Sequence, residues 1–180
     1  MAARLTAIPE SITERGPRAA VHSLMETWTD IARRAARSGA AASLLSAGAL
    51  ALCGWLENRA AAGPLNGPSQ WIFGRRAAYR RAPSARHTLT GLAIHHATAT
   101  GWALMHEKIW GERKAQQSPA QRLARAAATA AVANFVDYKL TPKRLQPGFE
   151  AQLSKQSLVL VYAAFAVGLA AVIGGTRRRD

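Results

Sequence analysis

The chain has 180 residues, a formal net charge of +14 and one cysteine, Cys53. The single cysteine excludes an intramolecular disulfide framework and, with five histidines in the whole chain, a cysteine-rich zinc module. The charge indicates anionic surroundings, either nucleic acid or an acidic membrane surface.

The first two predicted elements are an N-terminal extension, residues 1–37, and a membrane span, residues 38–56. In the extension, apolar residues recur at helical spacing: Leu24, Trp28, Ile31 and Ala35. This pattern predicts an amphipathic helix at the membrane interface, or alternatively a polar helical extension of the span. Residues 38–56 are nineteen residues without a charge, about the length that crosses ~30 Å of hydrocarbon.

The connection at residues 59–86 contains Pro64, Pro68 and several glycines, so it cannot be helical throughout. Trp71, Ile72 and Phe73 follow one another in this stretch. Because tryptophan is enriched at membrane interfaces, we expect a headgroup-level anchor. The alternative is a segment that folds back onto the helices.

Two further spans are predicted at residues 88–108 and 122–138. Both are more polar than a solitary span and would need partner helices to insert. The predicted fold is therefore all-α, a polytopic four-helix transmembrane bundle over residues 38–175. A two-span hairpin around a soluble middle is the alternative.

The last span, residues 157–175, is again nineteen residues without a charge. A basic tail, residues 176–180, follows it. Arginines directly abut the first span (Arg33, Arg34 and Arg37) and the last (Arg177, Arg178 and Arg179). The positive-inside tendency therefore favours a multi-pass bacterial inner-membrane protein with both termini in the cytoplasm.

The second span has a polar face. At 100° per residue, one broad side of this helix carries five polar side chains: His95, His96, Thr100, His106 and Glu107. The opposite arc is apolar and includes Ile94, Leu104 and Met105. Turning an ionisable group toward lipid costs ~2.5–3.5 kcal/mol on insertion scales, so we expect the polar face to be buried among the helices.

Two roles compete for this face. One is a metal site, a haem site or a proton relay, and the other is interhelical hydrogen bonding worth roughly 0.6 kcal/mol per contact. His95 and His106 are about 16 Å apart along the helix and cannot share a metal ion. A mixed site would use four candidate ligands: His95, His96, Glu57 and Asp137. The two carboxylates reach His95 only if the helices are staggered.

Three strings carry a resemblance: residues 63–74 (GPLNGPSQWIFG), 86–96 (RHTLTGLAIHH) and 136–150 (VDYKLTPKRLQPGFE). Together they are similar to a group of small bacterial multi-span membrane proteins of unknown function. This chain has Gly63 and Gly67 where that group is expected to carry alanine. The resemblance implies a compartment and a topology and transfers no site residue.

The sequence contains no P-loop, dinucleotide fingerprint or Gly-x-Ser-x-Gly elbow, so we assign no catalytic residue and no cofactor. Enzymatic activity stays open, and its absence is favoured. The predicted role is a structural or accessory subunit that contacts anionic headgroups and assembles with itself or in a membrane complex. The alternatives are a small transporter or ion- or proton-handling protein and, second, a metal-dependent membrane enzyme. Nucleic-acid binding would leave the charge-free spans unexplained.

Overall fold

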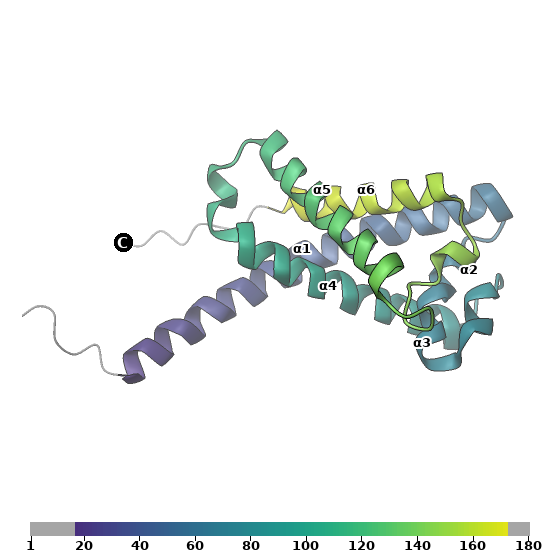
Figure 1. Cartoon of the computed structure of the whole chain (residues 1–180), viewed down its shortest axis with the longest axis horizontal. Helices are drawn as coiled ribbons and strands as arrows, with labels where there is room; N and C mark the ends of the chain where they lie inside the picture. Colours follow the sequence, from purple (N-terminus) through teal and green to yellow (C-terminus); the bar gives the residue numbers. More distant parts are fainter. Residues whose placement is uncertain (1–16, 173–180) are drawn as a thin grey trace, which may run out of the picture. The chain divides into compact units, whose positions relative to one another are not determined.

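The computed structural model describes the backbone of residues 17–172 and the side chains of residues 28–172 except residue 112. Over this range the structure is helical, without a strand (Figure 1). Four helices are long: α1 (Pro17–Asn58), α4 (Thr90–Trp110), α5 (Pro119–Phe135) and α6 (Lys155–Ala171). The basic tail at residues 176–180 lies outside the described residues.

The chain divides into two units, Met1–Asp30 and Ile31–Asp180. In the first unit the structure describes the start of α1, from Pro17. The second unit contains every other element. Helix α1 begins at Pro17, so the described part of the N-terminal extension is helical. Its position at the membrane interface, or as a polar extension of the first span, stays a prediction. Between Arg18 and Ser38 the sequence has neither proline nor glycine to stop a helix.

The long helices share one core made mainly of alanine. It draws residues from α1, α4, α5 and α6: Ala35, Ala42, Ala99, Ala103, Ala126, Ala130, Phe165, Ala166 and Leu169. Small side chains let the backbones approach closely. A Cβ atom added to Gly168 of α6 would lie 2.3 Å from the Cα atom of Ala42 on α1. We therefore attribute the packing of α6 on α1 to the missing side chain at Gly168.

Many large apolar side chains lie outside this core, although Phe165 and Leu169 belong to it and a second buried cluster contains Leu50, Cys53, Phe149, Leu153 and Val161. On the four long helices the exposed ones include Leu44, Leu45, Leu52, Trp55, Leu56, Leu104, Met105, Ile109, Leu123, Val132, Phe135, Val159, Leu160 and Val167. Several buried side chains are polar, among them Ser38, Ser43, Ser46, His95, His106, Glu107 and Lys114. So many exposed large apolar side chains around a partly polar interior are unusual for a water-soluble domain.

Among the described helices, one stretch is long and apolar enough to cross a membrane, Trp28–Asn58 within α1. Helix α6 is a shorter apolar helix. Helices α4 and α5 fall below this measure: α5 has only 17 residues, and α4 contains three histidines, Glu107 and Lys108, which lower its hydropathy. The all-helical class is thus confirmed, together with one candidate span; four spans stay a prediction.

The connections between α1 and α4 and between α5 and α6 form one structure, which we call the loop cap (residues 59–89 and 141–154). The first part consists of α2 (Ala62–Asn66), η1 (Gly67–Ser69), α3 (Gln70–Phe73), η2 (Arg75–Tyr79) and a π-helical turn, η3 (Ala85–Leu89). The second part contains η6 (Phe149–Ala151). The remaining short elements are η4 (Gly111–Gln116), between α4 and α5, and a π-helical turn, η5 (Val136–Leu140), after α5.

Trp71 is part of the loop cap rather than a free anchor at headgroup level. It is partly buried, and its indole Nε1 donates to the carbonyl oxygen of Gln146 at 3.2 Å. The neighbouring amide of Gln70 donates to the same oxygen at 2.6 Å. Only Ile72 of the Trp71–Phe73 triplet is strongly exposed. The connection therefore folds back, the alternative to the anchor that we expected.

Candidate functional site

The structure buries three of the five polar residues expected on one face of α4. His95, His106 and Glu107 are buried, and Thr100 is partly buried. His96 is exposed, contrary to expectation, although Glu107 and Thr100 lie within about 40° of it around the helix and are covered by neighbouring groups. Burial on this face therefore depends on which neighbour covers each turn of α4, and the angle around the helix does not decide it alone.

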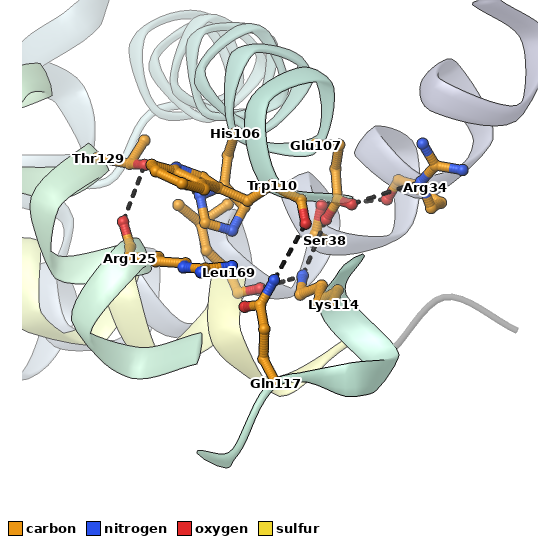
Figure 2. Close-up of polar contacts among 10 residues, drawn as sticks. All are labelled: Arg34, Ser38, His106, Glu107, Trp110, Lys114, Gln117, Arg125, Thr129 and Leu169. Carbon is orange, nitrogen blue, oxygen red and sulfur yellow. Dashed lines mark hydrogen bonds and ion pairs between the residues drawn. The ribbon is translucent and has the colours of Figure 1, made fainter. Parts of the chain in front are cut away.

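Glu107 belongs to a buried ionic cluster (Figure 2). Its Oε1 accepts from Lys114 Nζ at 2.8 Å, and its Oε2 lies 3.6 Å from Arg34 Nε. Lys114 Nζ also donates to the carbonyl oxygen of Leu169 at 2.6 Å. One carboxylate thus joins α4 to α1, and one ammonium group joins η4 to α6. Sequence patterning did not predict Lys114 as the partner of Glu107, because Lys114 lies beyond the predicted span 88–108, in the turn η4.

His106 ties α4 to α5. Its Nδ1 lies 2.9 Å from Thr129 Oγ1, and the Thr129 hydroxyl donates to the carbonyl oxygen of Arg125 at 3.1 Å. The Thr129 hydroxyl has one proton, which it donates to the carbonyl oxygen of Arg125. The proton in the bond between His106 and Thr129 therefore comes from His106 Nδ1. The Arg125 guanidinium in turn lies 4.7 Å from the ring centroid of Trp110. We interpret His106 as a structural hydrogen-bonding residue.

His95 contacts α1 and the loop cap. Its Nε2 lies 2.9 Å from Ser46 Oγ, and the Ser46 hydroxyl donates to the carbonyl oxygen of Ala42 at 2.7 Å. His95 therefore donates from Nε2, which leaves Nδ1 with a lone pair and the capacity to accept a hydrogen bond. The edge of its ring faces Phe149 of the loop cap, at a centroid distance of 5.8 Å.

His95 lines a cavity that holds about 550 Å³ of empty space, counting the part open at its mouth. Every long helix contributes to its wall, and so does the loop cap. The lining residues with a polar or aromatic side chain are Ser46, Trp71, His95, Thr98, Trp102, Asp137, Phe149, Tyr162 and Phe165. Among these residues Asp137 has the only carboxylate, and there is no lysine or arginine.

Asp137 lies in the π-helical turn η5, directly after α5. Its Oδ2 accepts from the Tyr162 hydroxyl of α6 at 2.6 Å. The π-turn ends the regular helix at Phe135, and such wider turns are frequent at functional sites. The structure thus brings two of the four candidate metal ligands, His95 and Asp137, to one cavity.

The other two candidate ligands do not line this cavity. His96 is exposed, and Glu57 binds the start of α6 instead: its carboxylate accepts from the Ser154 backbone N–H at 2.9 Å and from the hydroxyls of Ser154 and Ser157. These hydroxyls lower the pKa of Glu57 below its ordinary value. The described residues contain no group of three His, Cys, Asp or Glu side chains that could hold a metal ion.

A second hollow lies between α5 and α6. This α5–α6 groove encloses about 1370 Å³, counting its open side. Five alanines line it, together with larger apolar and aromatic side chains: Ala127, Ala130, Ala131, Ala163, Ala166, Tyr138, Leu158, Val159 and Tyr162. Lys139, Glu150 and Lys155 lie at its polar part. Tyr162 lines both hollows, so the wall between the groove and the cavity is thin at this side chain.

The three strings that carry the resemblance meet one another in and beside the loop cap. The Thr88 hydroxyl donates to Asn66 Oδ1 at 2.7 Å, and the Asn66 amide donates to the carbonyl oxygen of Arg80 at 2.8 Å. A Cβ atom added to Gly67 would lie 2.9 Å from the carbonyl oxygen of Pro147. The strings thus encode one tertiary contact region, which forms one end of the cavity.

Comparisons with protein-family models, curated proteins and solved structures gave no match. We therefore infer the function from the geometry of the cavity, the groove and the outer surface.

Proposed function

We propose that this chain is a multi-pass integral membrane protein of the bacterial inner membrane, in which α1, α4, α5 and α6 all cross the bilayer. The observation that carries the proposal is the distribution of side chains on the long helices. Many large apolar side chains lie on the outside, among them Leu44, Leu45, Leu52, Leu56, Val159 and Leu160, while Ser43, Ser46, His95, His106 and Glu107 lie inside. Hydrocarbon solvates the first group at no cost, and the helices satisfy the second group among themselves.

The same arrangement supports insertion of the more polar helices. Glu107 and Lys114 neutralise each other, and His106 bonds to Thr129 on α5. Paired in this way, polar groups of α4 are shielded from lipid by neighbouring helices. Arginines beside α1 and after α6 favour a cytoplasmic location for both termini.

The test of membrane integration is extraction of membranes with alkaline carbonate. An integral protein stays in the pellet, whereas release into the supernatant would contradict every spanning topology. A peripheral protein from the same membranes serves as the control for complete extraction.

Within the membrane, we propose that the protein acts as an accessory subunit and that its α5–α6 groove receives one transmembrane helix of another protein. Alanine-lined surfaces allow close helix–helix approach in lipid. The groove is concave, so a symmetric pair of copies that met through this face would bring two hollows together and leave them unfilled. A convex partner with larger side chains fits this shape better.

A photo-crosslinking residue at Ala131, which is exposed and lines the groove, tests this proposal. The matched control is the same residue at Ala93, exposed on α4. We expect one discrete adduct from position 131 alone, mapped by mass spectrometry to a transmembrane segment of a different protein. An adduct between two copies of this chain, or equal crosslinking from both positions, would contradict it.

The second candidate function is proton or ion handling. The observation that favours it is the presence of His95 and Asp137 in one cavity within the helices. In proteoliposomes, a proton-handling protein would change the internal pH in response to an imposed potential, and Asp137→Asn would abolish this response. Equal responses of the two proteins would exclude a role for the cavity.

A further inference from the structure

We propose that the cavity lined by His95, Trp102 and Asp137 binds a small organic cation, a quaternary ammonium or a protonated alkylamine, with Asp137 as its counter-ion. This inference goes beyond the accessory role and does not depend on a partner at the α5–α6 groove. Its failure would leave the membrane proposal intact, because the two have separate readouts.

The first observation concerns the negative charge of the Asp137 carboxylate. The chain carries a net charge of +14, yet in the part that the structure describes no ion pair joins Asp137 to a lysine or arginine. Its hydrogen-bond donor is the neutral hydroxyl of Tyr162. The acid on α4 differs, because Glu107 has both Lys114 and Arg34 beside it. A carboxylate withdrawn from water without a cation is costly, and a cationic ligand would remove that cost.

The second argument is the aromatic wall. Five aromatic side chains line the same cavity as Asp137: Trp71, Trp102, Phe149, Tyr162 and Phe165. The faces of aromatic rings attract cations, tryptophan most strongly, and cages of such rings recognise alkylammonium groups. Two of these side chains are held by hydrogen bonds, Trp71 to the carbonyl oxygen of Gln146 and Tyr162 to Asp137.

The third argument is the polarity of the groups that face the cavity. Its wall has no lysine or arginine that could hold an anion. His95, which donates from Nε2 to Ser46, offers Nδ1 as an acceptor, and Asp137 has a second carboxylate oxygen besides the one bound to Tyr162. A ligand that donates hydrogen bonds or carries positive charge complements these acceptors.

The residues that line the cavity favour an organic cation over a metal ion. The described residues offer no third His, Cys, Asp or Glu ligand beside His95 and Asp137. Aromatic and aliphatic side chains make up most of the wall, and they cannot replace the water shell of a hard inorganic ion. An alkylammonium group has a weakly hydrated, apolar surface that such a wall accommodates.

A free organic cation and the headgroup of a choline lipid both present a quaternary ammonium group to the cavity. We therefore use choline as the probe. Its neutral isostere, 3,3-dimethyl-1-butanol, has the same shape without the charge and serves as the comparison. Binding to the full-length protein in maltoside detergent is measured by calorimetry and by the fluorescence of the tryptophans. We expect choline to bind at least tenfold more tightly than the isostere.

Variants locate the site. Asp137→Asn should weaken choline binding at least tenfold, and Trp102→Leu should weaken it while leaving affinity for the isostere almost unchanged. Glu57→Gln is the matched carboxylate control outside the cavity and should bind choline as the wild type does. If Asp137→Asn fails to fold, as judged by its thermal melt, Asp137→Glu replaces it and should retain measurable binding.

Nanodiscs distinguish the two sources of the cation. Loss of choline binding in phosphatidylcholine discs, with binding kept in phosphatidylglycerol discs, identifies a lipid headgroup as the occupant. Binding in both identifies a free cation, and both results support the shared chemistry. Equal affinity for choline and the isostere, the absence of binding to folded wild-type protein, or unchanged binding by Asp137→Asn would each overturn the proposal.

Discussion

The ammonium nitrogen of Lys114 lies 2.8 Å from Glu107 Oε1, and each side chain is only about 2% exposed. Buried pairs of this kind contribute little net stability compared with apolar residues, but removal of one partner leaves a charge without compensation. We therefore expect Lys114→Met to lower the free energy of unfolding by about 3 kcal/mol. Thermal and denaturant unfolding in detergent measure this change.

The double variant Glu107→Gln with Lys114→Met removes both charges and should recover more than half of the loss. A double-mutant cycle gives the coupling directly. Losses that simply add in the double variant would contradict the interpretation of these residues as a coupled pair.

The bond between Ser46 and His95 should contribute modestly to stability. Ser46→Ala and His95→Leu are each expected to cost on the order of 1 kcal/mol, the usual net value of one buried hydrogen bond. His96→Leu is the matched control on the same helix and should not lower stability, because it replaces an exposed polar side chain on a membrane helix with an apolar one. A larger loss from His96→Leu than from His95→Leu would mean that the burial of α4 is assigned to the wrong face.

The carboxylate of Glu57 predicts a pH dependence. Hydrogen bonds from Ser154 and Ser157 lower its pKa in the folded state, so it stabilises the fold above the pKa of the unfolded chain, about 4.3. This contribution is lost as the pH falls through the lower, folded-state value. Wild-type protein should melt at a higher temperature than Glu57→Gln at pH 7, and the difference should shrink below about pH 4. A difference that grows in acid would contradict the assigned bonds.

Two glycines on α4 make a matched pair for testing the contact with the loop cap. A Cβ atom at Gly91 would lie 2.0 Å from the carbonyl oxygen of Leu65, whereas nothing lies within 4 Å of one at Gly101. Gly91→Ala should therefore destabilise the protein, and Gly101→Ala should stabilise it by up to about 1 kcal/mol through helix propensity. The melting temperatures of the two variants, measured in parallel, check the opposite signs.

The four-span topology predicts that the two ends of α4 lie on opposite sides of the membrane. Single cysteines at Arg80 and Ala115, both exposed, report this in a Cys53→Ser background with an impermeant thiol reagent. We expect intact spheroplasts to label one position and only permeabilised cells to label both. Labelling of both positions in intact spheroplasts would favour the two-span hairpin.

Uncharged stretches located the apolar parts of α1 and α6, and helical spacing located most of the buried polar face of α4. The wheel of α4 placed His95, His106 and Glu107 on one side, where the structure buries them. It also included His96, because a broad face drawn from 100° steps has no sharp edge until neighbouring helices define it. The partner of Glu107 was not predicted, since the turn at η4 that brings back Lys114 has no periodic signal.

The loop cap was the least predictable part. Prolines and glycines indicated an irregular stretch, but they could not show that Gln146, 75 positions away, would accept the indole proton of Trp71. The same limit applied to the cavity. Sequence spacing made the approach of Asp137 to His95 conditional on staggered helices, and only the three-dimensional arrangement of α4, α5 and η5 decided it.

The contact between Gly67 and Gly148 has a consequence for biogenesis. A Cβ atom added to Gly148 would lie 2.7 Å from the carbonyl oxygen of Gly67, so the two backbones touch across a separation of about eighty residues. During synthesis, the first half of this contact leaves the ribosome long before the second. The residues around Asn66 and Gln70 therefore stay incompletely packed until the ribosome has synthesised α5. Closure of the cavity is then one of the last steps of folding, and a nascent chain that ends before Gly148 lacks Phe149 and the α6 residues of the cavity wall.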